Sequence, residues 1–309
     1  MGLMRAALLR GSESRWLEGQ FRRRSFAKKA VSRFMPGETP EDALRVAKVL
    51  EARGIETIVT CLGENVVTEE DANGVHQHYL AVVDKIHEQG LRTHPSVKLT
   101  HMGLDLGVEV AQRGVAQLAA AAAQNGSFLW VDMEYARYVD ETLDVLDAVR
   151  SDQENVGVCL QAYLHRTPED LRRLAGAGVP IRLVKGAYNE APDVAIQRKS
   201  DVDRAFFELG VELARAYQGS GQRHALATHD VPLIRRIQRA LGPPTDGEHP
   251  FEVQMLYGIR RPAQRQLADE GIPVRILISY GDAWFPWYMR RLAERPANVG
   301  FVLKSVFSG

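Results

Sequence analysis

Residues 155–186 read NVGVCLQAYLHRTPEDLRRLAGAGVPIRLVKG and contain a complete strand–helix–strand pattern. The apolar runs at 156–162 and 180–186 have the length and the residue types of buried strands. Between them, 167–176 begins with Thr167-Pro168-Glu169-Asp170, which reads as an N-cap residue, a proline at the first helical position and acids in the first turn. The stretch therefore predicts one βα unit followed by the strand of the next.

The same unit repeats along the chain. Strands are predicted at 56–62, 93–99, 127–133, 156–162, 180–186, 224–229, 251–256 and 273–279. Helical patterns fill the gaps, for example in the alanine-rich 105–124, and the units average roughly 31 residues, the length of a βα unit. Eight such units predict a distorted, closed (β/α)8 barrel of the TIM type. No Gly-x-Gly-x-x-Gly follows a predicted strand, which argues against a Rossmann domain.

The N-terminal residues 1–54 have helical patterns throughout, with a second start signal at Thr39-Pro40. We therefore expect an N-terminal helical segment at 1–54 and a catalytic barrel domain at 55–309.

The composition indicates an ordinary globular protein. Of 309 residues, 45% are hydrophobic and 25% charged, and 39 basic residues balance 39 acidic ones. A net charge of zero gives no overall attraction to nucleic acid. Cys61 and Cys159 lie in apolar runs, as expected of buried, reduced thiols, and no stretch approaches the ~18 apolar residues of a transmembrane helix. These features predict a cytoplasmic protein.

Polar residues gather where the predicted strands end, which is where barrel enzymes hold their active sites. They are Glu64, Lys98, Asp132, Gln161, Lys185, Thr228, His229 and Gln254. Each alone has a structural explanation, such as an ion pair between Lys98 and Asp132 or a core histidine at His229. Together they favour a binding site, because burying polar groups costs several kcal/mol unless they have partners.

After the eighth strand, residues 281–296 read GDAWFPWYMRRLAERP. Pro286 and Pro296 bound a short helix that carries Arg290 and Arg291. The pattern allows a solvated ion pair from Arg290 to Glu294 or a site for a small anion under a helix that lies across the barrel mouth. An excess of cations with few acid–base candidates favours an anionic ligand and chemistry supplied by a cofactor.

Seven blocks in order resemble the proline dehydrogenase family, flavin-dependent barrels that occur alone or fused in bifunctional proline utilisation enzymes. The resemblance covers about residues 55–305. The blocks are 62–64 (LGE), 96–99 (SVKL), 131–134 (VDME), 160–163 (LQAY), 182–188 (RLVKGAY), 227–229 (ATH) and 288–294 (YMRRLAE).

The resemblance implies a substrate site and an FAD site. Arg290 and Arg291 would bind the carboxylate of L-proline together with Lys98. Lys98 would also pair with Asp132, and Glu64 would pair with Arg291. Arg182 would lie near flavin N5 and stabilise the reduced flavin. The positions implied to line the FAD are Gln161, Arg182, Val184, Lys185, Gly186, Ala187, Tyr188, Thr228, His229, Gln254, Leu256, Arg291 and Glu294.

The family reaction implied is oxidation of proline to Δ1-pyrroline-5-carboxylate, the first step of proline catabolism. Hydride passes from ring C5 to flavin N5, and electrons continue to ubiquinone or menaquinone. A peripheral contact with the inner face of the cytoplasmic membrane is implied, as is a separate pyrroline-5-carboxylate dehydrogenase that takes the product.

One position departs from the family. Short barrels of this type often carry a tyrosine thirteen residues before the first arginine, where this chain has Leu277. Either Tyr280 reaches in from a shifted loop, or the pocket is more apolar and roomier, which leaves the discrimination between proline and hydroxyproline open.

Two other functions remain open from the residues alone. A class I aldolase or lyase would use Lys98 or Lys185 as a Schiff-base nucleophile, although the expected pairing of Lys98 with Asp132 argues against it. A non-catalytic barrel that binds anions would use the same cations.

Overall fold

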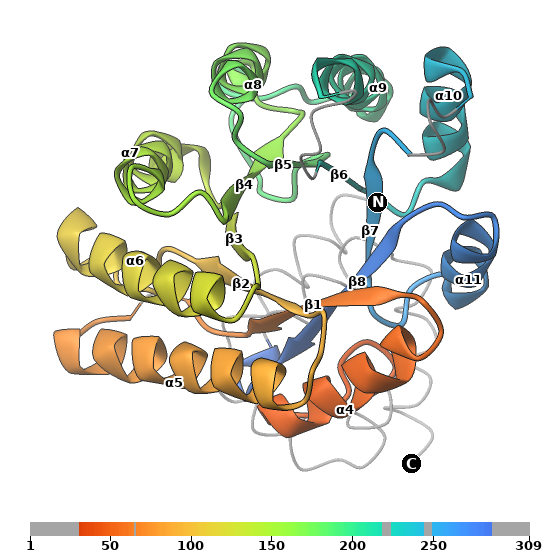
Figure 1. Ribbon diagram of the computed structural model, residues 1–309. Coiled ribbons are helices and arrows are strands. Elements are labelled where there is room, and N and C mark those ends of the chain that lie inside the picture. Colours follow the sequence, from red (N-terminus) through yellow and green to blue (C-terminus); the bar gives the residue numbers. More distant parts are fainter. Residues whose placement is uncertain (1–30, 65, 218–223, 244–248, 286–309) are drawn as a thin grey trace, which may run out of the picture.

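The protein forms a closed parallel barrel (Figure 1). The computed structural model describes residues 31–64, 66–217, 224–243 and 249–285. Neighbouring strands follow the chain order, and β8 pairs with β1 to close the ring. The strands are β1 (Glu56–Cys61), β2 (His94–Lys98), β3 (Leu129–Asp132), β4 (Val156–Gln161), β5 (Ile181–Val184), β6 (Ala225–Ala227), β7 (Glu252–Leu256) and β8 (Val274–Tyr280). The predicted barrel is confirmed, and β8 continues one residue beyond its predicted end.

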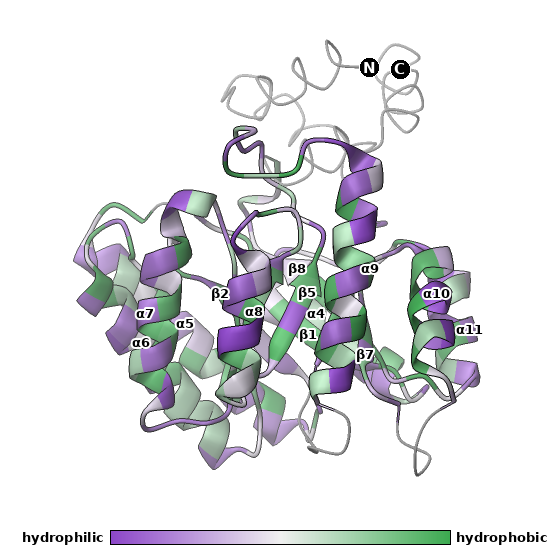
Figure 2. Cartoon of the chain, turned by 90° about the horizontal axis from the view of Figure 1, so that it is seen from above, coloured by the Kyte–Doolittle hydropathy of each residue, from purple (hydrophilic) through white to green (hydrophobic). Residues whose placement is uncertain are grey.

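The helices lie outside the ring of strands (Figure 1). They are α4 (Pro40–Glu51), α5 (Glu69–Glu88), α6 (Val108–Gln124), the short η1 (Ala136–Tyr138), α7 (Val139–Arg150), α8 (Thr167–Gly176), α9 (Lys199–Ala216), α10 (Val231–Leu241) and α11 (Arg261–Asp269). Figure 2 shows hydrophilic and hydrophobic residues alternating along helices such as α8 and α9, as expected when one side packs on the barrel. The helix predicted across the mouth lies outside the described residues.

Helix α4 precedes the barrel and begins as predicted. Asp42 N donates to Thr39 Oγ1 at 3.2 Å, and Pro40 is the first helical residue. Residues 35–37 are not helical, so the prediction of helix throughout 1–54 is wrong at this point. Ala43, Leu44 and Ala47 of α4 belong to the hydrophobic core shared with the barrel. The domain division at residue 54 stays a prediction.

The barrel interior is filled by side chains. Trp130 of β3 is 1% exposed. Gly157 of β4 lies directly against it, because a Cβ at this glycine would be 2.8 Å from Trp130 Cζ3. Any larger residue at 157 would therefore overlap with the indole and with the Pro180 carbonyl, 2.7 Å from the same Cβ position.

The two cysteines are free, as predicted. Cys159 is buried, and burial raises the pKa of its thiol. Cys61 is partly exposed, so the expectation of burial holds for one of the two.

Candidate active site

Several predicted site residues face the barrel interior together. Side chains alternate along a strand, and laterally paired residues of parallel strands point to the same face. The register pairs Lys98 with Asp132, Gln161 with Val184, and Leu256 with Leu277. These pairs therefore occupy the C-terminal half of the interior, which is the active-site end of such barrels.

A row of charges crosses this end of the barrel. Lys98 Nζ lies 3.7 Å from Asp132 Oδ2, so the predicted ion pair is present. Arg182 Nη2 pairs with Asp132 Oδ1 from the other side, and Ser96 Oγ lies 3.0 Å from the same nitrogen. One carboxylate thus serves two cations, and the row of Lys98, Asp132 and Arg182 carries one net positive charge toward an anionic ligand.

Arg182 is held in a fixed plane although it is a long side chain. It is 3% exposed, and its Cζ lies 5.1 Å from the centroid of the Trp130 ring. Gln254 Oε1 accepts from Arg182 Nη1 at 3.5 Å. Sequence reasoning missed Ser96 and Trp130, but both lie two residues before a predicted site residue, Lys98 and Asp132 respectively, and the strand period of two could have found them.

At the end of β4, Gln161 has one amide atom fixed and one without a partner. Its Nε2 donates to the carbonyl of Glu134 at 2.6 Å. Its Oε1 is buried and has no hydrogen-bond partner within the described part of the chain. Thr167 Oγ1 donates to the Gln161 carbonyl at 2.6 Å. Thr167 is the first residue of α8, so its prediction as the N-cap is wrong. The cap position belongs to Arg166.

Glu134 was not singled out from the sequence as a site residue. Thr100 N and Oγ1 donate to its two carboxylate oxygens at 3.0 and 2.8 Å. Burial raises the pKa of this carboxyl. Glu134 therefore links the loop that follows Lys98 at the end of β2 to the loop that follows Asp132 at the end of β3.

Lys185 does not face the interior with the others. Its Nζ lies 2.5 Å from Asp203 of α9 and 3.0 Å from Asp230, the N-cap of α10. Its side chain therefore belongs to the helical layer, because it is one residue beyond the inward-facing Val184. In the same loop Gly186 has φ +117°, Ala187 is exposed, and the Tyr188 ring lies 4.3 Å from the Tyr135 ring.

After β6, the side chains of Thr228 and His229 accept hydrogen bonds from backbone N–H groups. Asp230 N donates to Thr228 Oγ1 at 3.2 Å, and Leu256 N donates to His229 Nε2 at 3.5 Å. His229 therefore bridges the ends of β6 and β7.

Tyr280 does not face the barrel interior. It is 0% exposed, and its hydroxyl lies 2.8 Å from Nε2 of His78 in α5. Leu277 faces the interior and Tyr280 is three residues further along, an odd step that turns it to the helical layer. The alternative in which Tyr280 replaces the family tyrosine is wrong, and the apolar Leu277 stands at that position.

The remaining predicted residues are at the edge of the described structure or beyond it. Glu64 is exposed in the loop after β1. Arg290, Arg291 and Glu294 lie outside the described residues.

His101, which follows β2, has its pKa lowered to about 4 by burial and by the charge of Lys98.

A closed barrel with polar groups at the C-terminal ends of its strands defines the class of (β/α)8-barrel enzymes. The family described as proline dehydrogenase matches residues 43–304 of the sequence. The chain belongs to the proline dehydrogenase family.

Two relatives match over most of their length. Proline dehydrogenase 1 of Bacillus subtilis (strain 168) is 37% identical over 274 residues, which are 89% of this chain and 89% of that protein. Proline dehydrogenase of Deinococcus radiodurans is 34% identical over 288 residues, 90% of each chain.

Proline utilization A from Bdellovibrio bacteriovorus, solved after inactivation by N-propargylglycine, has a similar barrel. It superposes with a TM-score of 0.76 at 22% identity, over 86% of this chain and 32% of that one. The chain thus spans about a third of that larger protein, and the likeness concerns the fold.

Proposed function

We propose that this protein is an FAD-dependent L-proline dehydrogenase that forms Δ1-pyrroline-5-carboxylate. The observation that carries the proposal is the row of Lys98, Asp132 and Arg182 at the C-terminal ends of β2, β3 and within β5, in a chain of this family. Lys98 would offer a positive charge to a substrate carboxylate, and Arg182 would offer a second one to a redox group. Lys98 and Lys185 are both ion-paired with carboxylates, surroundings unlike the apolar pocket that activates a Schiff-base lysine.

The residues of the interior fit a flavin. Gln161 Oε1 is a buried acceptor that needs a donor, and an N–H of an isoalloxazine ring is of the right kind. Arg182 presents a fixed positive charge, which favours a group that becomes anionic on reduction. Bound FAD would supply the hydride acceptor. Gln161, Arg182, Val184, Gln254 and the loop of Gly186 to Tyr188 would hold it.

The substrate would be held by its carboxylate and its ring. Lys98 would bind the carboxylate with Arg290 and Arg291, and the paired Leu256 and Leu277 offer an apolar wall to the ring carbons. Asp132 would keep Lys98 in place beneath the substrate. The amine has to be neutral for its lone pair to assist, so these residues would bind the deprotonated amine form.

We further propose that electrons leave to a membrane ubiquinone or menaquinone and that a separate pyrroline-5-carboxylate dehydrogenase consumes the product. A cytoplasmic protein with a peripheral contact at the inner membrane face would meet such an acceptor. Within the part of the chain that the structure describes, no helix has both the length and the apolar character to span a bilayer.

The purified protein should be yellow, and anaerobic L-proline should bleach it with stoichiometric formation of the pyrroline. A soluble quinone analogue should restore the colour. Lys98→Met should raise the proline KM roughly ten-fold or more through loss of a charge-assisted contact, whereas Lys48→Met at an exposed position of α4 should not. A colourless protein that takes up no FAD, or inactivation by borohydride in the presence of substrate, would contradict the proposal.

A further inference from the structure

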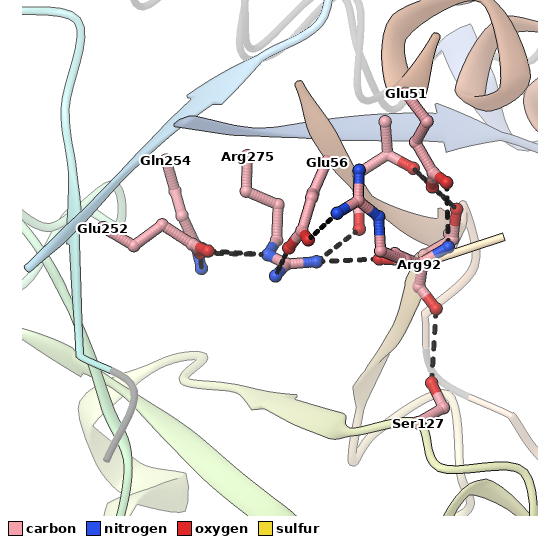
Figure 3. Close-up of polar contacts among 9 residues, drawn as sticks. Glu51, Glu56, Arg92, Ser127, Glu252, Gln254 and Arg275 are labelled. Carbon is pink, nitrogen blue, oxygen red and sulfur yellow. Dashed lines mark hydrogen bonds and ion pairs between the residues drawn. The ribbon is translucent and has the colours of Figure 1, made fainter. Parts of the chain in front are cut away.

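A second charge cluster lies at the floor of the barrel, at the N-terminal ends of the strands (Figure 3). Arg275 of β8 is 0% exposed, and its Nε lies 3.0 Å from both carboxylate oxygens of Glu252. Its Nη2 pairs with Glu56, and its Nη1 donates to the carbonyls of Thr57 and Arg92 at 3.2 and 3.0 Å. Arg275 is thus fixed to β1, β7 and the residues that lead into β2, and it fixes Glu252 in turn.

Gln254 connects this floor to the charge row of the active site. It is 3% exposed and donates from Nε2 to Glu252 Oε1 at 2.8 Å (Figure 3). Its Oε1 accepts from Arg182 Nη1 at 3.5 Å. A carboxylate only accepts hydrogen bonds and a guanidinium only donates them. A single orientation of the amide therefore satisfies both neighbours, and Glu252 secures the orientation in which the oxygen of Gln254 faces Arg182.

The strand between them leaves room for this contact. The register places Ala225 of β6 beside Arg182 and Ala227 beside Gln254. Leu226 points outward, because a Cβ at Gly210 of α9 would lie 3.3 Å from its Cδ2. Small side chains at both inward positions of β6 let the guanidinium of Arg182 and the amide of Gln254 meet across it.

We propose that Glu252 is a positioning residue for Arg182 and acts through Gln254. The inference rests on the proposed function, in which Arg182 faces the redox group. Asp132 and Ser96 hold one side of the guanidinium, and Gln254 is the acceptor at Nη1. Without an oriented acceptor there, Nη1 loses its partner, and the guanidinium can tilt about the end that Asp132 and Ser96 still hold, which shifts its positive charge relative to the redox group.

The test uses the full chain loaded with FAD, at a temperature well below unfolding. In Glu252→Gln the new amide can donate or accept, so the orientation of Gln254 depends on its 3.5 Å contact with Arg182 alone. The FAD dissociation constant should rise roughly ten-fold, and kcat should fall with little change in the proline KM. Gln254→Met keeps the Glu252–Arg275 pair and should show the same changes. If Glu252→Gln fails to fold, the exchange of residues 252 and 254 tests Glu252 instead, because it keeps one carboxylate in the pair.

The exchange Glu252→Gln with Gln254→Glu keeps one amide and one carboxylate between Arg275 and Arg182. FAD affinity should return toward that of the natural protein, whereas the flavin midpoint potential should fall because the negative charge is now nearer. Glu212→Gln is the matched control, since Glu212 pairs with Arg172 on the surface at 2.6 Å and should change neither quantity.

A purely structural role predicts another outcome. Glu252→Gln and Gln254→Met would then lower Tm but leave the FAD dissociation constant and the midpoint potential unchanged, and the inference would be overturned while the proposed function stands. A natural protein that binds no FAD would overturn the proposed function itself.

Discussion

Gly186 lies so close to the ring of Tyr163 that no side chain fits between them. A Cβ at residue 186 would be 2.2 Å from Tyr163 Cδ1, and Gly186 has φ +117°, a conformation that favours glycine. The hydroxyl of Tyr163 donates to the carbonyl of Tyr188 at 3.3 Å. The Tyr163 ring therefore shapes the loop after β5 that we propose lines the FAD.

Gly186→Ala should lower the free energy of unfolding by about 2–4 kcal/mol, since backbone strain and overpacking both contribute. Gly54→Ala is the control, because Gly54 has φ +75° but nothing within 4 Å of a Cβ, and strain alone should cost about 1 kcal/mol. Urea unfolding of both variants measures the difference. Equal losses would show that the contact with Tyr163 yields without cost.

Asp132→Ala should lower turnover while the barrel stays folded. Asp132 is the shared partner of Arg182, which is 3% exposed, and Lys98, so its removal leaves two cations facing each other without a carboxylate. We expect a loss of about 3 kcal/mol in unfolding free energy, as for other broken buried pairs.

Asp147→Ala provides the comparison, because Asp147 pairs with Arg173 at 2.8 Å with both side chains about half exposed. Surface pairs contribute less than about 1 kcal/mol. If Asp132→Ala kept full activity, Asp132 would be a structural residue only.

The strands were predictable because a parallel barrel covers both faces of each strand. Such strands read as short apolar runs between helices, and each observed strand starts inside its predicted range. The polar residues at their ends could also be found, since Asp132 and Gln161 follow apolar runs and Lys98 stands near the end of its predicted strand. The positions of these residues along the chain were enough to place them at one end of the barrel.

The face of the strand on which a residue lies was predicted less well from the sequence. Lys185 and Tyr280 each lie an odd number of residues from an inward-facing neighbour, so the period of two turns them toward the helices. The contact of Arg182 with Asp132 crosses the barrel from β5 to β3 and skips β4. Its existence depends on the order of the strands in the sheet, which no local pattern contains.

His101 should make the stability of the protein pH-dependent below neutrality. Burial, helped by the charges of Lys98 and His78 and opposed by Asp282, lowers its pKa from 6.5 to about 4. The unfolded chain therefore binds the proton first. The contribution of the neutral ring is present above pH 6.5 and is lost as the pH falls toward 4, up to roughly 3 kcal/mol.

His101→Gln should flatten the fall of Tm between pH 6.5 and 4. The exposed His87, replaced in the same way, should leave the profile unchanged. Thermal unfolding in a series of buffers separates the two variants, and a parallel profile for His101→Gln and the natural protein would contradict this account of His101.

Leu277 should govern the choice between proline and hydroxyproline. Leu277 and Leu256 are register partners on the interior face, and neither offers a hydrogen-bond partner to a ring hydroxyl. Leu277→Tyr would fill the space beside the ring, so kcat/KM for 4-hydroxyproline relative to proline should fall by roughly ten-fold. Leu277→Met keeps the volume and should leave the ratio unchanged. Tyr280→Phe removes the hydroxyl bound to His78, which lies in the helical layer. This variant should lower Tm without changing the ratio of the two kcat/KM values. A changed ratio in Tyr280→Phe would contradict the assignment of the apolar wall to Leu277.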